Sequence, residues 1–122
     1  MHYLNKDIGK YGEDLAETYL KNLGYEILDK NFSCKFGEID LIGKDKEYTC
    51  FIEVKTRYGT FYGYPCEAVT KNKQFKIYKV AQLYILKKKL FNENFRFDVM
   101  EILLNNNEKN PSIRLIKNAF YI

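Results

Sequence analysis

Two short runs in which charged and apolar residues alternate constrain the fold of this chain more than any other feature. They are Gly37–Ile42, with the sequence GEIDLI, and Phe51–Arg57, with the sequence FIEVKTR. Such alternation is typical of strands, whose alternate residues lie on the same face of a sheet. One face of the two predicted strands therefore carries four charged residues, namely Glu38, Asp40, Glu53 and Lys55.

The polar stretch between these runs, GKDKE, predicts that they form a hairpin. We expect Asp45 and Lys46 to form its two-residue turn. Glu38 then lies opposite Glu53, and Asp40 lies one diagonal away. A register slipped by one residue would send part of these side chains to the other face. The hairpin therefore predicts one charged surface backed by an apolar one.

Three carboxylates on one surface repel one another, so the cluster predicts either a bound proton or a bound cation. Mg²⁺ or Mn²⁺ would suit it, since Mg²⁺ takes oxygen ligands from one or two carboxylates and keeps several waters. Such a cation can activate a water and stabilise the charge that develops on a phosphate. Lys55 would reach the same point and could assist the attacking water. The spacing therefore favours phosphodiester hydrolysis, and a charged ladder on a solvated sheet face is the alternative.

Composition argues against other kinds of catalysis and leaves the partner open. The single histidine, His2, stands at the start of the chain, so mechanisms that need a histidine base are not expected. The cysteines, Cys34, Cys50 and Cys66, lack the C-x-x-C spacing of a zinc site, and we expect free thiols. A net charge of +4 favours a polyanionic partner only weakly. With no apolar run of about 20 residues and no secretory signal, we expect a cytoplasmic protein without a membrane partner.

Periodicity and turn residues predict seven elements in the order α-β-β-β-α-β-β. Helices are expected at 6–23 and from 71 to about 89, and strands at 25–29, 37–42, 48–56, 95–104 and 112–120. No linker or internal repeat interrupts the chain, so residues 1–122 are expected to form a single domain. This order predicts an α/β fold with a mixed central β-sheet flanked by helices.

The motifs GEIDLI, FIEVKTR, EAVTKNKQ and RFDV, in this order, resemble the YraN-like family of small bacterial proteins. The resemblance covers Gly9–Ile102. That family is placed in the restriction-endonuclease-like, PD-(D/E)xK superfamily, near the archaeal Holliday-junction resolvases. The resemblance implies a restriction-endonuclease-like fold and a metal-dependent endonuclease that acts on DNA.

The resemblance also implies roles for individual residues. Asp40 matches the first metal ligand, although Ile39 stands where the superfamily label has proline. Glu53 matches the second metal ligand, and Lys55 matches the catalytic lysine. Glu13 resembles the acidic residue that resolvase-like members carry on a helix, with a plain surface acid as the alternative. The recurrent polar positions of the family also include Glu38 and Lys73.

These observations give three sets of candidate residues. The expected metal ligands are Asp40, Glu53, the Val54 carbonyl and Glu38, and the expected catalytic residues are Asp40, Glu53, Lys55 and Glu13. Nucleic-acid contacts are expected from Arg57, Lys71, Lys73 and Gln74. Arg57 could instead cap a strand end, and the lysines could form a solvated helix face. Gln74 is four residues from Tyr78, as in a Q-x-x-x-Y element of some related nucleases, a spacing that chance also gives.

We therefore expect a Mg²⁺- or Mn²⁺-dependent nuclease that hydrolyses DNA phosphodiester bonds, with branched or single-stranded DNA in repair or recombination as the candidate substrate. Phosphate contacts from Lys and Arg should make binding sensitive to salt. A homodimer would supply two sites for cutting both strands. The alternative is a non-catalytic nucleic-acid-binding module or a subunit of a DNA-processing complex. The sequence does not distinguish RNA from DNA as the partner.

Overall fold

The computed structural model describes residues 5–58, 69–104 and 111–120. Its helices are α1 (Asn5–Asn22) and α2 (Lys71–Lys88). Its strands are β1 (Glu26–Cys34), β2 (Gly37–Asp45), β3 (Tyr48–Tyr58), β4 (Asn94–Leu104) and β5 (Ser112–Ile116). This order confirms the predicted succession of helices and strands. His2 and Cys66 lie outside the described residues.

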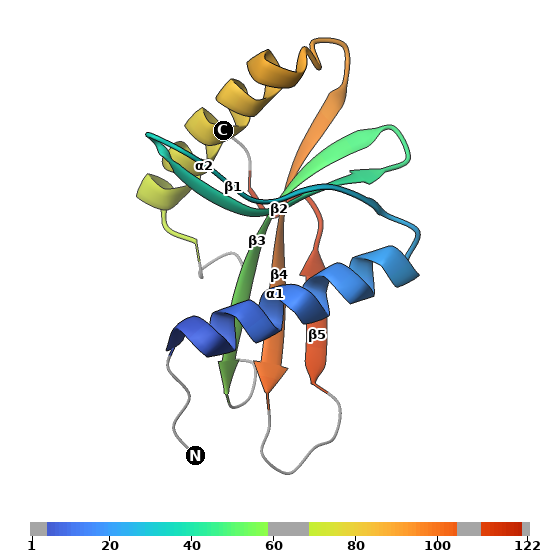
Figure 1. The fold of residues 1–122 in the computed structure, drawn as a ribbon, viewed down its shortest axis with the longest axis vertical. Coiled ribbons are helices and arrows are strands. Elements are labelled where there is room, and N and C mark those ends of the chain that lie inside the picture. The colour runs from blue at the N-terminus through green and yellow to red at the C-terminus, as the bar shows by residue number, and fades with distance from the viewer. Residues whose placement is uncertain (1–4, 59–68, 105–110, 121–122) are drawn as a thin grey trace.

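The strands form one five-stranded sheet in the order β1-β2-β3-β4-β5 (Figure 1). β3 and β4 run parallel, whereas the other neighbouring strands run antiparallel, so the sheet is mixed as predicted. A parallel pair needs a long crossover connection, and α2 lies in the segment that joins β3 to β4. The described part of the chain is therefore a mixed α/β fold with two helices.

The two helices pack on opposite faces of the sheet. Leu20 of α1 belongs to the apolar cluster that contains Ile52 of β3. Tyr84 of α2 packs edge-on against Phe51, with the ring centroids 5.9 Å apart. Phe51 and Ile52 are adjacent in a strand and therefore point to opposite faces. In Figure 1, α1 crosses one side of the sheet while α2 lies beside the curved β1–β2 hairpin.

Three strands differ in length from the prediction by three residues or more, and one of them is β2, which continues past Ile42 to Asp45. β1 extends to Cys34 and spans 9 residues, because its second half pairs with β2 even though its sequence is largely polar. β1 is an edge strand with alternately exposed residues, so an apolar pattern is not required there. β5 ends at Ile116, because a turn follows in which Asn118 adopts a φ of 54°.

The hairpin between β2 and β3 has a different turn from the one predicted. Asp45 pairs with Tyr48, so the turn residues are Lys46 and Glu47. Lys46 adopts a φ of 56°, in the left-handed region. Asp45 stays in the strand, and its carboxylate accepts a hydrogen bond from the Arg96 guanidinium at 3.1 Å. This ion pair gives a physical reason for the later turn.

The expectation that Glu38 lies opposite Glu53 is therefore wrong. Leu41 pairs with Ile52, and continuing this register places Asp40 opposite Glu53. The partner of each residue moves by two positions relative to the prediction. Because the side-chain period of a strand is two, Asp40, Glu53 and Lys55 still share one face. Glu38 does not join them, since its neighbour Ile39 packs in the cluster of Phe51 on that face and Glu38 therefore points to the other face.

Two expectations about chemistry and environment can be compared with the structure. Cys34 and Cys50 are free thiols, and Cys50 is buried in the apolar cluster beneath α1. Neither helix in the described part of the chain has both the length and the apolar character needed to span a membrane.

Candidate active site

β2 and β3 diverge at the point where the charged motifs meet. Their pairing ends at Leu41 and Ile52, beyond which β2 continues beside β1 and β3 continues beside β4. Asp40 is the first residue of β2 beyond the shared ladder. Its Oδ2 accepts a hydrogen bond from the Val54 backbone N–H at 2.8 Å. Both backbone groups of a strand residue point to the same neighbour, so the Val54 carbonyl faces β2 as well.

Glu53 is the most buried carboxylate of the predicted site, with its side chain only 8% exposed. Its Oε1 lies 3.2 Å from the Lys73 ammonium of α2. Its Oε2 is buried and has no hydrogen-bond partner within the described part of the chain. Burial raises the pKa of Glu53 to about 7, with the Asp40 carboxylate as the next cause and Lys73 opposing both. A cation would stabilise this arrangement of two close carboxylates.

Two lysines complete this group. Lys55 follows Glu53 on the same face of β3, and Lys73 approaches from α2. Burial and the neighbouring Lys73 lower the pKa of Lys55. Although burial also opposes the charge on Lys73, contacts with Lys55 and Glu53 hold the pKa of Lys73 above its ordinary value. Lys55 is therefore the lysine that gives up its proton more readily, as a proton acceptor must.

A third carboxylate approaches from α1, on the opposite face of the sheet. Gly12 lies so close to β3 that a Cβ there would fall 1.7 Å from Thr56 Oγ1. This close approach brings the next residue, Glu13, to the region where β2 and β3 diverge. Burial, and then the Asp40 carboxylate, raises the pKa of Glu13. Glu13 therefore lies within the electrostatic reach of Asp40.

Asn31 of β1 connects Glu13 to Glu38. In the amide orientation that satisfies both carboxylates, its nitrogen donates to Glu13 Oε1 at 3.0 Å and to Glu38 Oε1 at 2.8 Å. Asn31 has a φ of 51°, a left-handed conformation that asparagine adopts more readily than most residues. Sequence reasoning missed Asn31, and an asparagine within the long polar half of β1 was the available signal.

Arg57, a predicted phosphate contact, has a partner inside the protein. Its guanidinium lies 3.3 Å from the carboxylate of Glu101, which Arg114 also approaches at 3.2 Å. The Glu101 side chain is only 4% exposed, and its register partner across the parallel pair is Lys55. Arg57 itself remains 43% exposed, so its predicted contact with a phosphate stays a prediction. Sequence reasoning also missed Glu101, which the single charge in the run VMEILL could have revealed.

The N-terminus of α2 adjoins the site. Thr70 caps it by accepting a hydrogen bond from the Lys73 N–H at 3.2 Å. Lys71 is exposed in the first turn, where a nucleic-acid contact stays a prediction. Gln74 is buried, and its amide donates to the Val69 carbonyl at 3.0 Å. This hydrogen bond uses Gln74 inside the fold, so we do not retain it as a nucleic-acid contact.

The carboxylates can be tested as a metal site by their donor chemistry. Among residues 5–58, 69–104 and 111–120, no group of three or more His, Cys, Asp or Glu side chains is gathered closely enough to hold a metal ion. Mg²⁺ does not need such a group, since one or two carboxylates and several waters satisfy it. Asp40, the Glu53 Oε2 and the Val54 carbonyl form a donor set of that kind. These residues therefore fit a hard divalent cation.

Comparisons with known proteins identify the family. The model of the family described as "Uncharacterised protein family UPF0102" matches residues 12–102, which include both charged motifs. A UPF0102 protein of Clostridium kluyveri is 61% identical over 122 residues, with 100% of both chains covered. A UPF0102 protein of Clostridium botulinum (strain Loch Maree) is 62% identical over 123 residues, again with 100% of both chains covered. The chain therefore belongs to the UPF0102 family, which confirms the family resemblance of its motifs.

Proposed function

We propose that this protein is a Mg²⁺- or Mn²⁺-dependent nuclease with a restriction-endonuclease-like fold that hydrolyses DNA phosphodiester bonds. One observation carries the proposal. Asp40 and Glu53 meet where β2 and β3 diverge, and Glu53 has a raised pKa and a buried oxygen without a hydrogen-bond partner within the described residues. A charge ladder on a solvated sheet would not bury a carboxylate in this way.

Each residue of the site has a defined task in this mechanism. Asp40, Glu53 and the Val54 carbonyl would hold the cation, and the Val54 N–H fixes the orientation of the Asp40 carboxylate. The cation, when bound, supplies Lewis-acid stabilisation of the phosphate and lowers the pKa of water. Lys55, whose pKa is lowered, would take a proton from the attacking water. Glu13 would add negative charge from the α1 side.

The ion pair between Lys73 and Glu53 would be replaced when a cation binds. In this structure Lys73 neutralises part of the charge on Glu53. A bound cation would take over that task, and Lys73 would then be available to a phosphate of the substrate. The proposal therefore keeps Lys73 as a nucleic-acid contact and adds its role as the partner of Glu53 in the metal-free protein.

The same ion pair is the observation that favours a second candidate function. Because Lys73 already offsets part of the charge on Glu53, the fold can form without a cation, as a non-catalytic nucleic-acid-binding module would. The raised pKa of Glu53 weighs against this alternative, since the ion pair leaves the carboxylate only partly compensated. Cleavage assays separate the two candidates.

The decisive experiment is cleavage of labelled linear duplex, single-stranded, flap and four-way-junction DNA, with Mn²⁺, Mg²⁺ or EDTA. We expect metal-dependent cleavage that falls about 100-fold or more in Lys55→Ala, because a positioned proton acceptor contributes at least that much. Lys46→Ala, in the exposed β2–β3 turn, is the matched control and should cut normally. If no DNA is cut while Lys55→Ala and the unmodified protein bind equally, the binding module replaces the nuclease.

A further inference from the structure

Two exposed phenylalanines lie together at the tip of the β1–β2 hairpin and on the first half of α2. Phe36 is 37% exposed and Phe75 is 51% exposed. The Lys79 ammonium lies 5.4 Å from the ring centroid of Phe36 and 4.7 Å from that of Phe75. The Lys35 ammonium lies 5.2 Å from the ring of Phe36. We call these four residues the aromatic–lysine platform.

The folding of the hairpin gives no reason for a phenylalanine at its tip. Cys34 pairs with Gly37, so Lys35 and Phe36 form a two-residue turn, a position that favours Gly, Asn, Asp or Ser. The unusual conformation belongs to Gly37, whose φ is +146°. A Cβ on Gly37 would lie 3.8 Å from Val80, so the tip is placed against α2. The hairpin therefore presents Phe36 beside α2, although the turn itself does not need it.

Phe75 is equally unnecessary to the packing of α2. Its neighbours Gln74 and Ile77 are buried, whereas Phe75 is on the exposed side of the helix. Single exposed apolar residues are ordinary on protein surfaces. Two phenylalanine rings from distant parts of the chain share one lysine, and they form an exposed cluster for which the packing of the fold gives no reason.

The charge around the platform identifies the class of ligand. α2 carries six lysines and no acidic residue, and Lys35 adds a further positive charge at the hairpin tip. A polyanion is therefore the complementary partner. Lysines interleaved with exposed aromatic rings are what binds single-stranded nucleic acid, because the lysines contact phosphates while the rings stack on bases. Bases inside a duplex are already stacked and do not offer their faces.

The platform is close to the candidate active site. Phe36 and Asp40 are four residues apart on the same hairpin, which corresponds to about 13 Å along a strand. Phe75 follows Lys73, the partner of Glu53, by two residues on α2. A strand held at the platform would therefore lie within a few nucleotides of Asp40 and Glu53.

We propose that the aromatic–lysine platform stacks unpaired bases of a DNA or RNA strand, and that the substrate of the site carries unpaired nucleotides beside the bond that is cut. The first part stands on the platform alone. The second part rests on the proposed nuclease function. The chemistry shared by the two ligand sources is an exposed nucleobase on a phosphate backbone, and the probes below separate DNA from RNA.

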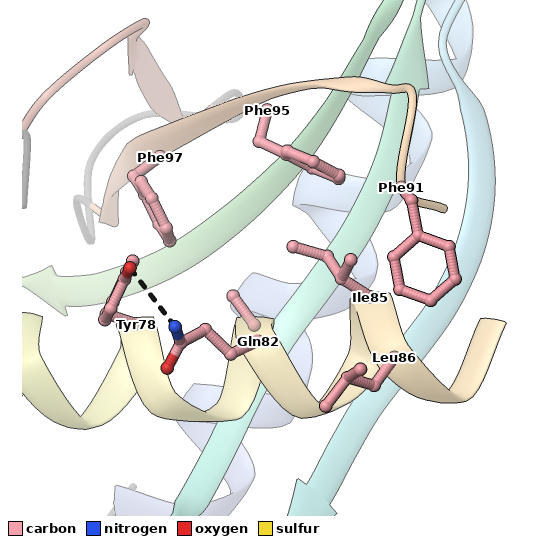
Figure 2. A pocket seen from close by; sticks show the side chains of 8 residues that line it. Tyr78, Gln82, Ile85, Leu86, Phe91, Phe95 and Phe97 are labelled. Carbon is pink, nitrogen blue, oxygen red and sulfur yellow. Dashed lines mark hydrogen bonds between the residues drawn. The ribbon is translucent and has the colours of Figure 1, made fainter. Parts of the chain in front are cut away.

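A different surface of α2 supplies the control. Phe91 is 62% exposed and lies in an apolar groove of about 520 Å³ between α2 and the start of β4 (Figure 2). The groove also contains Ile85 and Leu86, and Tyr78 accepts a hydrogen bond from Gln82 at 3.2 Å on its wall. Nothing in the structure shows what fills this groove. Phe91 is thus as accessible as Phe75 but lies beyond the other end of the helix.

Tryptophan fluorescence tests the platform directly, because the chain contains no tryptophan. The F75W and F91W variants would each be titrated in EDTA with oligo(dT), oligo(U) and blunt duplex DNA. We expect the single strands to quench F75W and leave F91W unchanged, with the duplex at least several-fold weaker. Adding Phe36→Ala to F75W should weaken single-strand binding about five-fold or more, because one base then has no ring to stack on.

The outcomes separate the platform from the nuclease proposal, since the titration contains no metal and measures no cleavage. A preference for oligo(dT) or for oligo(U) identifies the strand chemistry and supports the platform. Equal quenching by duplex and single strand, equal quenching of F75W and F91W, or binding that Phe36→Ala leaves intact would each overturn it. Quenching with no cleavage of any DNA in Mn²⁺ would support the platform and remove the nuclease.

Discussion

At the scale of single residues, the unusual feature of this protein is that the Glu53 carboxylate is buried while its charge is only partly compensated. The carboxylate is buried beside Asp40, and among the residues that the structure describes only one of its oxygens has an ion-pair partner. Its pKa is therefore raised from an ordinary value of 4.5 to about 7. A carboxylate with a raised pKa is harder to ionise in the folded protein than in the unfolded chain. Ionisation of Glu53 thus opposes folding until a cation compensates it.

The first prediction concerns stability as a function of pH in the absence of metal. The folded protein binds the Glu53 proton more tightly than the unfolded chain does, so the free energy of unfolding should fall as pH rises from about 4.5 to about 7. The fall from this one group should be at most about 3 kcal/mol. Glu53→Gln should remove it. Urea denaturation at several pH values from 4 to 8 measures the difference between the two proteins.

Glu47→Gln is the matched control for that comparison, because Glu47 is exposed in the β2–β3 turn. It should follow the unmodified protein at every pH. A Glu53→Gln variant that loses stability with pH as the unmodified protein does would show that Glu53 ionises freely. The metal site proposed on its strained carboxylate would then lose its main support.

At the scale of elements, the site depends on how closely α1 approaches β3. A Cβ on Gly12 would lie within 2.8 Å of three Thr56 side-chain atoms, including Cβ, which a rotamer change does not move away. Only glycine allows this distance between helix and strand. Since Glu13 follows directly, the approach that glycine permits also sets the position of the third carboxylate.

The second prediction is that Gly12→Ala weakens both stability and activity. The clash with Thr56 should cost about 1–3 kcal/mol of the free energy of unfolding, as overpacking does in other cores. Displacement of Glu13 should lower metal-dependent cleavage by as much as about 100-fold. Urea denaturation and cleavage rates measure the two effects.

Gly9→Ala, one helical turn earlier, is the control, because nothing lies within 4 Å of a Cβ at that position. Alanine is the better helix former, so this variant should gain up to about 1 kcal/mol and cut normally. If Gly12→Ala matched it in both measurements, the close approach of α1 would have no role in the site.

The elements also show which parts of the site a sequence can predict. The alternation in GEIDLI and FIEVKTR was sufficient to place Asp40, Glu53 and Lys55 on one face, even though the turn moved to Lys46 and Glu47. The predicted register was wrong by two residues, and a shift by an even number of residues leaves each side chain on the same face of the sheet. A local alternation of charged and apolar residues can therefore predict on which face of a sheet a side chain lies, because this face follows from the two-residue period of the strand.

Contacts between distant elements were not predictable in the same way. The Lys73–Glu53 ion pair depends on how α2 crosses the sheet, and no local pattern encodes that crossing. The bridge from Asn31 to Glu13 and Glu38 depends on a left-handed residue inside an edge strand. The burial of Gln74 and the hydrogen bond from its amide to the Val69 carbonyl likewise depend on how the start of α2 packs, which its sequence position does not encode.

At the scale of the whole molecule, positive charge is concentrated on one element. The six lysines of α2 exceed the net charge of +4, so the rest of the chain is net negative. An even distribution of the same charge would attract nucleic acid from every side. In the proposed complex, the observed distribution would direct the phosphate backbone along α2, between the aromatic–lysine platform and the carboxylates of the site.

The last prediction follows from this distribution and uses two variants with the same net charge. Lys71→Gln with Lys76→Gln removes two exposed lysines of α2, whereas Lys21→Gln with Lys117→Gln removes two from elsewhere. Binding of an oligonucleotide in EDTA would be measured between low and physiological salt. Removing one lysine that binds a phosphate should reduce the slope of log affinity against log salt by about 1. The α2 variant should therefore show a slope smaller by up to about 2, and the slope of the other variant should hardly change.

An equal reduction in both would mean that net charge, rather than the arrangement of lysines on α2, attracts the nucleic acid. The path of the strand along α2 would then have to be abandoned.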